Sequence, residues 1–165
     1  MSSNLSIGDG GLRYGHDGWT TIDVRPPADF VCKVPDLPAA VWLQSWGCVE
    51  MIHVLEHFCP WDAKSLLSQC FQILGPGGLL ILEMPNLEYC CRKLADGINV
   101  DKAMQGIFGD PAHKDPGMRH MWGYTPKSLM TLLEESALEP GWKFIREKRA
   151  QFHKRRRDFR VEATK

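Results

Sequence analysis

The sequence has no excess charge of either sign, with 20 Lys+Arg and 20 Asp+Glu in 165 residues. A general nucleic-acid binder usually carries a net basic field, so this balance makes nucleic acid an unlikely partner. Long hydrophobic runs are also missing, because no stretch approaches the roughly 18–20 apolar residues of a membrane span. The N-terminus has neither the basic segment nor the apolar stretch of a signal peptide. We therefore expect a cytoplasmic protein with no membrane segment.

The cysteines lack the spacing that metal or redox sites use, because no C-x-x-C pair occurs among the six. Most of them lie in apolar runs, where a thiol behaves as a small hydrophobe. We predict reduced, structural cysteines rather than a disulfide framework or a zinc knuckle.

Short apolar runs bounded by turn residues alternate with helical patterns along a chain of single-domain length, residues 1–165. This alternation predicts a doubly wound, Rossmann-like α/β sheet that is mostly parallel and ends in an antiparallel strand pair. Residues 98–124 form one long irregular stretch, of the kind that often covers a substrate. Strands are expected at 5–7, 20–24, 30–32, 48–54 and 79–84, helices at 62–74, 86–96 and 125–137, and the final pair at 142–147 and 159–163.

A glycine turn, Gly8-Asp9-Gly10-Gly11, follows the first predicted strand, and Asp23 ends the second. Glycine lets the backbone approach a ligand closely, and ligands of doubly wound folds lie beyond the carboxyl ends of the strands. A carboxylate at the second strand end can accept both hydroxyls of a ribose. Arg13 stands where G-x-G-x-x-G needs its third glycine, so a plain structural turn remains an alternative.

Five short blocks follow one another along the chain: Gly8-Asp9-Gly10, Ile22-Asp23, Asp36-Leu37-Pro38, His53-Val54-Leu55-Glu56-His57-Phe58 and Leu74-Gly75-Pro76-Gly77-Gly78-Leu79. Their order and spacing resemble the class I S-adenosylmethionine-dependent methyltransferases. The chain is most similar to the small bacterial and phage predicted methyltransferases of the type 11 branch. The resemblance covers nearly the whole chain, which begins at the first strand without the usual N-terminal helix. It implies methyl transfer from S-adenosylmethionine to the hydroxyl of a small molecule or glycan.

The resemblance also implies which residues bind the cofactor. Lys33 stands where the family usually has an acid, Asp9 separates the two glycines, and residues 39–47 lack the usual polar lead into the fourth strand. Because of these departures, a non-catalytic binding protein of the same fold is an alternative function. A nicotinamide-dependent oxidoreductase is a second alternative, although such an enzyme would need the complete G-x-G-x-x-G pattern. The implied cofactor residues are Gly8 and Gly10 for the methionine portion, Asp23 for the ribose, Lys33 and Val34 for the adenine, and His53 facing the sulfonium.

Three histidines are candidate catalytic residues: His53, His57 and His120. A hydroxyl acceptor must lose its proton, and histidine has a suitable pKa, so His120 in the irregular stretch is the preferred general base. A surface-loop histidine without a role is the alternative. The basic run 154–157 is interpreted as a solvated hairpin loop, with a phosphate or nucleic-acid contact as the other possibility.

The segment from His53 to Glu56 and His57 matches H-x-x-E-H, a zinc-peptidase signature that requires a helix. His53 instead closes a strand-like run, which argues against a peptidase. Some class I methyltransferases acting on hydroxyls hold a divalent ion with Glu and His at this place; alternatively, Glu56 and His57 only brace the loop. We expect no metal, because a strand end that turns into a loop seldom aims both histidines at one point.

Overall fold

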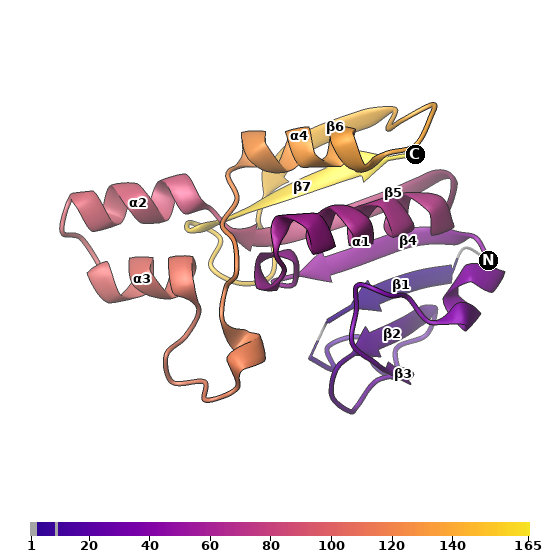
Figure 1. Ribbon diagram of the computed structural model, residues 1–165, viewed down its shortest axis with the longest axis horizontal. Helices are drawn as coiled ribbons and strands as arrows, with labels where there is room; N and C mark the ends of the chain where they lie inside the picture. Colours follow the sequence, from indigo (N-terminus) through magenta and orange to yellow (C-terminus); the bar gives the residue numbers. More distant parts are fainter. Residues whose placement is uncertain (1–2, 9) are drawn as a thin grey trace.

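The computed structural model describes residues 3–8 and 10–165, which form one seven-stranded sheet in the order β3-β2-β1-β4-β5-β7-β6. Pairs among the first five strands are parallel, whereas β7 runs antiparallel to both β5 and β6. The predicted Rossmann-like sheet with its C-terminal antiparallel pair is therefore confirmed (Figure 1). The strands are β1 (Ser3–Ile7), β2 (Trp19–Asp23), β3 (Phe30–Val31), β4 (Trp46–Ile52), β5 (Leu74–Pro85), β6 (Phe144–Arg149) and β7 (Asp158–Thr164).

Two helices, α1 (Pro60–Ile73) and α4 (Pro126–Ser136), pack on one face of this sheet (Figure 1). Alternate strand residues meet them in the apolar core, as Leu80 of β5 and Val161 of β7 do. The helix α1 begins at Pro60 rather than at a cap formed by Asp62, because proline suits a first helical position that needs no N–H partner. No helix in the described residues is long and apolar enough to cross a membrane.

The stretch 98–124 is more ordered than the sequence predicted. It contains the helix α3 (Val100–Phe108) and the short 3-10 turn η3 (Pro116–Met118). The expectation of an irregular stretch was wrong here although the helical pattern is present, because apolar residues recur at helical spacing in Val100, Ala103, Met104, Ile107 and Phe108. Together with α2 (Leu87–Ala95), α3 forms a helical hairpin that projects beyond the strand ends (Figure 1).

The opposite face of the sheet carries buried polar side chains instead of a second apolar layer. Loops satisfy them: Arg13 pairs with Glu50 of β4 at 2.7 Å, and three backbone N–H groups of residues 151–153 donate to Glu83 of β5. These bonds fix the loop between β6 and β7 beside the carboxyl end of β5. Two further 3-10 turns, η1 (Ala39–Leu43) and η2 (Leu55–His57), flank β4.

Candidate active site

The glycine turn follows the carboxyl end of β1, the strand that lies between β2 and β4 in the sheet. Gly8 has φ +68°, and an added Cβ would lie 2.7 Å from Cγ2 of Val54, so a side chain is excluded there. Gly10 has φ +61°, but an added Cβ would meet no atom within 4 Å. The turn is therefore closed on the Gly8 side and open at Gly10, where a ligand has room to approach the backbone.

Asp23 joins the glycine turn to the end of β2. One of its carboxylate oxygens accepts the N–H of Gly10 at 3.0 Å, and the other accepts the N–H of Arg25 at 3.0 Å. A carboxylate oxygen can accept more than one hydrogen bond, so Asp23 keeps capacity for two hydroxyl groups of a ligand. The structure thus brings Gly10 and Asp23 together in an arrangement that fits a ribose-bearing cofactor.

The two predicted adenine residues follow β3 but differ in exposure. The side chain of Lys33 is exposed, whereas Val34 is only 6% exposed and packs in the apolar core. Only the backbone of Val34 is therefore available to an adenine. Asp9, which the sequence singled out between the two glycines, lies outside the described residues.

His53 follows β4 with φ +56°, and its ring lies between two carboxylates. Its Nδ1 is 3.1 Å from Oε1 of Glu56, and its Nε2 is 2.9 Å from Oδ2 of Asp158. Burial by itself would lower the pKa of His53, but the two carboxylates outweigh burial and raise the pKa to about 9. At neutral pH His53 is an imidazolium with no lone pair to take up a proton. His53 is therefore not suited to act as a general base, the role for which His120 is preferred.

Glu56 lies in η2 at the centre of the site and is 2% exposed. Its backbone carbonyl accepts the N–H groups of Met121 at 2.8 Å and Trp122 at 3.1 Å, which fasten the segment 119–122 over η2. As a result, the rings of His57 and His120 lie 5.0 Å apart in an edge-on arrangement. Two of the three predicted catalytic histidines are thus neighbours.

Both of these histidines are held by backbone carbonyls. Nδ1 of His57 is 3.0 Å from the oxygen of Arg119, and Nδ1 of His120 is 3.1 Å from the oxygen of Gly106. A carbonyl oxygen only accepts, so each Nδ1 carries the hydrogen, and the lone pair of a neutral imidazole would then lie on Nε2. Burial lowers the pKa of His120, which keeps it neutral, and its Nε2 is 4.0 Å from Oε1 of Glu56. His120 has the protonation state of a base.

Glu56, His57 and His120 also form a possible set of metal ligands, because their donor atoms all lie within 4.8 Å of one another. Three ligands at about 2.0–2.2 Å from one ion lie somewhat closer together, so modest side-chain rotations would be needed. From the sequence, His53 and His57 were the two histidines considered as ligands of one ion, but the ring of His53 points to Asp158 instead. The third ligand of the possible set is His120, which comes from a distant segment of the chain.

Two residues of the site were missed in the sequence. Asp158 is 7% exposed and accepts bonds from Nε of Arg157 at 2.6 Å and from the backbone N–H of Lys154, so it links the basic loop to His53. Nothing in its local sequence indicates this. The hydroxyl of Tyr124 is buried without a hydrogen-bond partner among the described residues, and burial raises its pKa. The Trp122-Gly123-Tyr124-Thr125-Pro126 block was the available signal for Tyr124.

Comparison with known proteins shows the family and the fold of the chain. A family model described as a methyltransferase domain matches residues 15–140. A SAM-dependent methyltransferase from Archaeoglobus fulgidus is 15% identical, with a TM-score of 0.61 over 99% of this chain and 86% of that chain. One from Methanosarcina mazei is 18% identical, with a TM-score of 0.59 over 99% and 92%.

A third similar structure is 1,6-didemethyltoxoflavin-N1-methyltransferase from Burkholderia thailandensis, solved with bound 1,6-didemethyltoxoflavin and S-adenosylhomocysteine. It is 15% identical, with a TM-score of 0.63 over 99% of this chain and 71% of that chain. At these identities the likeness shows a shared fold. No curated protein matches the sequence.

Proposed function

Because the chain belongs to the methyltransferase-domain family, we propose that it transfers a methyl group from S-adenosylmethionine to a hydroxyl of a small molecule or glycan. The observation that carries the proposal is the bond between Gly10 and Asp23, which sets an open backbone turn beside a carboxylate. This turn lies at β1, where the strand order reverses, and doubly wound folds bind their ligands at that point. The Burkholderia structure, solved with S-adenosylhomocysteine, supports this choice of cofactor.

The cofactor residues act mainly through backbone and one carboxylate. When bound, S-adenosylmethionine supplies an electrophilic methyl group on its sulfonium. Gly10 allows the chain to approach the methionine portion, and Gly8 lets the turn pack against Val54 beside it. Asp23 accepts the ribose hydroxyls, and residues 33–34 meet the adenine through their backbone. Alignment of two reactants in one site supplies much of the rate of such a displacement.

His120 is the proposed proton acceptor for the hydroxyl. Its Nε2 is the free nitrogen of a neutral ring, and the nearby Glu56 carboxylate stabilises the imidazolium that forms when a proton arrives. His57 packs edge-on against His120 and limits its rotation. His53 is a positioning residue, because as a cation between Glu56 and Asp158 it fixes both carboxylates.

We further propose that this cluster works without a bound metal. The imidazolium of His53 already lies 3.1 Å from Glu56 and balances the buried negative charge that an ion would otherwise balance. The carbonyl bonds of His57 and His120 hold both rings in place without an ion.

Calorimetric titration with S-adenosylmethionine, S-adenosylhomocysteine and NAD in parallel tests the proposed function. We expect the first two to bind and NAD not to bind. Asp23→Ala should weaken S-adenosylhomocysteine binding by about 1.5–3 kcal/mol, the range for hydrogen bonds to a charged group. The matched control is Asp17→Ala, which removes an exposed carboxylate from the turn before β2 and should change nothing.

The other outcomes are equally informative. Binding of NAD alone would favour an oxidoreductase. Binding of none of the three would favour a non-catalytic protein of this fold. An Asp23→Ala loss of only a few tenths of a kcal/mol would place the ribose elsewhere.

A further inference from the structure

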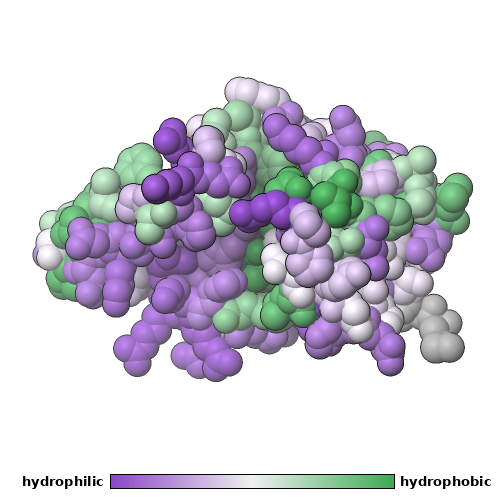
Figure 2. Space-filling model, turned by 90° about the horizontal axis from the view of Figure 1, so that it is seen from below, coloured by the Kyte–Doolittle hydropathy of each residue, from purple (hydrophilic) through white to green (hydrophobic). Residues whose placement is uncertain are grey.

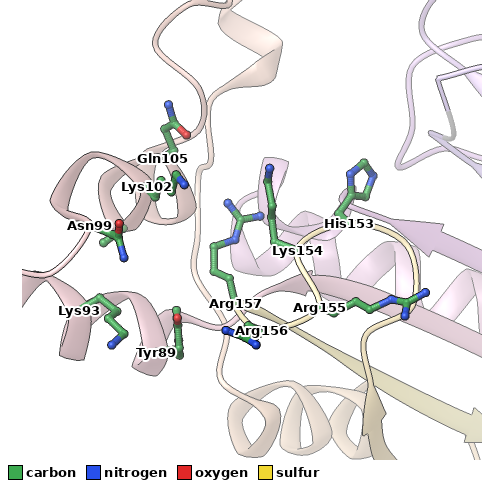
Figure 3. A pocket seen from close by; sticks show the side chains of 11 residues that line it. Tyr89, Lys93, Asn99, Lys102, Gln105, His153, Lys154, Arg155, Arg156 and Arg157 are labelled. Atoms are coloured by element: carbon green, nitrogen blue, oxygen red, sulfur yellow. The ribbon is translucent and has the colours of Figure 1, made fainter.

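A cavity of about 360 Å³ lies between the α2–α3 hairpin and the loop that joins β6 to β7 (Figure 3). No Asp or Glu is among its lining residues. Its cationic lining residues are Lys93 and Lys102 from the hairpin and Lys154, Arg155, Arg156 and Arg157 from the loop. In a chain of zero formal net charge, this is a strong local concentration of one sign.

Several of these cations are not neutralised by the protein. Arg157 donates to the carboxylate of Asp158, but Lys102, Lys154 and Arg156 form no side-chain ion pair within residues 3–8 and 10–165. Figure 3 shows Lys154 and Arg157 extending from the loop on the side that faces α3, with Arg156 nearer to Tyr89. Seen from below, hydrophilic side chains are concentrated in the half of the molecule that carries α2 and α3, inward of an outer end that is partly apolar (Figure 2). Such crowding of like charge is unfavourable until an anion lies among them.

The cavity adjoins the active site. His153 lines it, and the ring of His153 lies 4.4 Å from the ring of His53. Gly106 of α3 makes a second connection. An added Cβ on Gly106 would lie 3.3 Å from Cδ of Arg157, and the carbonyl oxygen of Gly106 is hydrogen-bonded to Nδ1 of His120. One residue of α3 therefore lies against both the basic loop and the proposed base.

We propose that the methyl acceptor carries a phosphate or diphosphate ester, which binds in this cavity and brings the acceptor hydroxyl to the neighbouring histidine cluster. The role as acceptor rests on the function proposed above. Guanidinium groups match phosphate oxygens in bidentate geometry, and lysines add point charges around them. The volume is near the lower end of small-molecule sites, which span roughly 300–1,000 Å³. A nucleic-acid strand would instead need a groove several nucleotides long.

Binding of small esters to the purified chain tests the proposal. Uridine diphosphate and glucose 1-phosphate are titrated calorimetrically, and they distinguish a nucleotide-linked from a simple phosphate ester. We expect at least one of them to bind, with an affinity that falls as salt is raised. The double variant Lys154→Gln/Arg156→Gln should lose about tenfold or more of that affinity, because it removes two charge-assisted contacts.

The matched control is Lys127→Gln/Lys143→Gln, which removes two exposed charges away from the cavity and should retain ester binding. S-adenosylhomocysteine binding is measured on every variant and should not change. If neither ester binds while S-adenosylhomocysteine does, this inference is wrong and the proposed function stands. If an ester binds but S-adenosylhomocysteine does not, the assignment to a methyl acceptor is wrong.

Two more results would overturn the inference. Equal losses in the control and the test variant would show a diffuse charge effect rather than a site. A 12-nucleotide single-stranded RNA that binds more tightly than both esters, and is lost in the Lys154→Gln/Arg156→Gln variant, would make nucleic acid the ligand.

Discussion

The carboxyl edge of the sheet divides into two halves of different construction (Figure 1). At β1 and β2 the groups available to a ligand are a glycine backbone and the carboxylate of Asp23. At β4, β5 and β7 they are ionisable side chains in contact with one another, centred on Glu56 and His53. The first half is suited to holding a constant cofactor, and the second to the charge changes and specificity that an acceptor requires.

Removing a carboxylate from the ionisable half, the cluster around Glu56 and His53, should have the largest effect on stability. Asp158→Ala removes the buried carboxylate that pairs with His53 and Arg157, which leaves Arg157 without its ion pair and His53 with Glu56 alone. We expect the free energy of unfolding, measured in urea, to fall by roughly 3–5 kcal/mol. The exposed pair of Lys64 with Glu135 is the comparison, and Glu135→Ala should cost less than about 1 kcal/mol. Similar losses in the two variants would contradict a buried network.

The same half should make stability depend on pH. The pKa of His53 rises from 6.5 to about 9 on folding, so its contribution is complete below pH 6.5 and is lost as pH rises through 9. We expect the free energy of unfolding to fall by roughly 2–4 kcal/mol across that interval. His53→Gln should flatten the profile. A wild-type profile that is already flat between pH 6.5 and 9.5 would show that His53 is not held as a cation.

In the half formed by the glycine turn and Asp23, a single added methyl group should change both stability and ligand binding. Gly10→Ala and Gly77→Ala place the same strain on a left-handed residue, since neither added Cβ meets an atom within 4 Å. Each should lower stability by about 1–2 kcal/mol. Only Gly10→Ala should also weaken S-adenosylhomocysteine binding, because Gly77 lies near the N-terminal end of β5, away from the carboxyl edge where the ligand is expected. If both variants bind the ligand like the wild type, the glycine turn is not part of the site.

The smallest expected effect is that of removing metal. Elemental analysis of the purified chain should find no stoichiometric zinc, manganese or magnesium, and EDTA should leave the urea midpoint unchanged. One ion per chain that disappears in His57→Ala would instead make Glu56, His57 and His120 its ligands. A metal-bound acceptor hydroxyl would then replace His120 as the route for the proton.

The two halves also differ in how far the sequence predicts them. Gly8, Gly10 and Asp23 are close in the chain and follow predicted strands, so strand alternation was enough to place them at one edge. Asp158 approaches His53 only because β7 pairs antiparallel with β5, and no local pattern specifies that contact. The nearness of His57 and His120 depends on the bonds that fasten residues 119–122 to Glu56.

The helical layer and the polar face of the sheet show the same limit. Thr125 and Pro126 predicted the start of α4 correctly, because a capping residue and a first-position proline are local signals. The helix α3 also carries a local signal, because apolar residues recur at helical spacing from Val100 to Phe108, so the expectation of an irregular stretch there was a misreading of the pattern. The loop that satisfies Glu83 with backbone N–H groups is a tertiary contact across 68 to 70 residues of chain.

The most direct test of this division is a crystal structure of the chain with S-adenosylhomocysteine and uridine diphosphate together. We predict S-adenosylhomocysteine at the Gly8–Gly10 turn, with its ribose hydroxyls bonded to Asp23, and the diphosphate among Lys102, Lys154 and Arg156. S-adenosylhomocysteine bound in the basic cavity, with the glycine turn empty, would contradict the account.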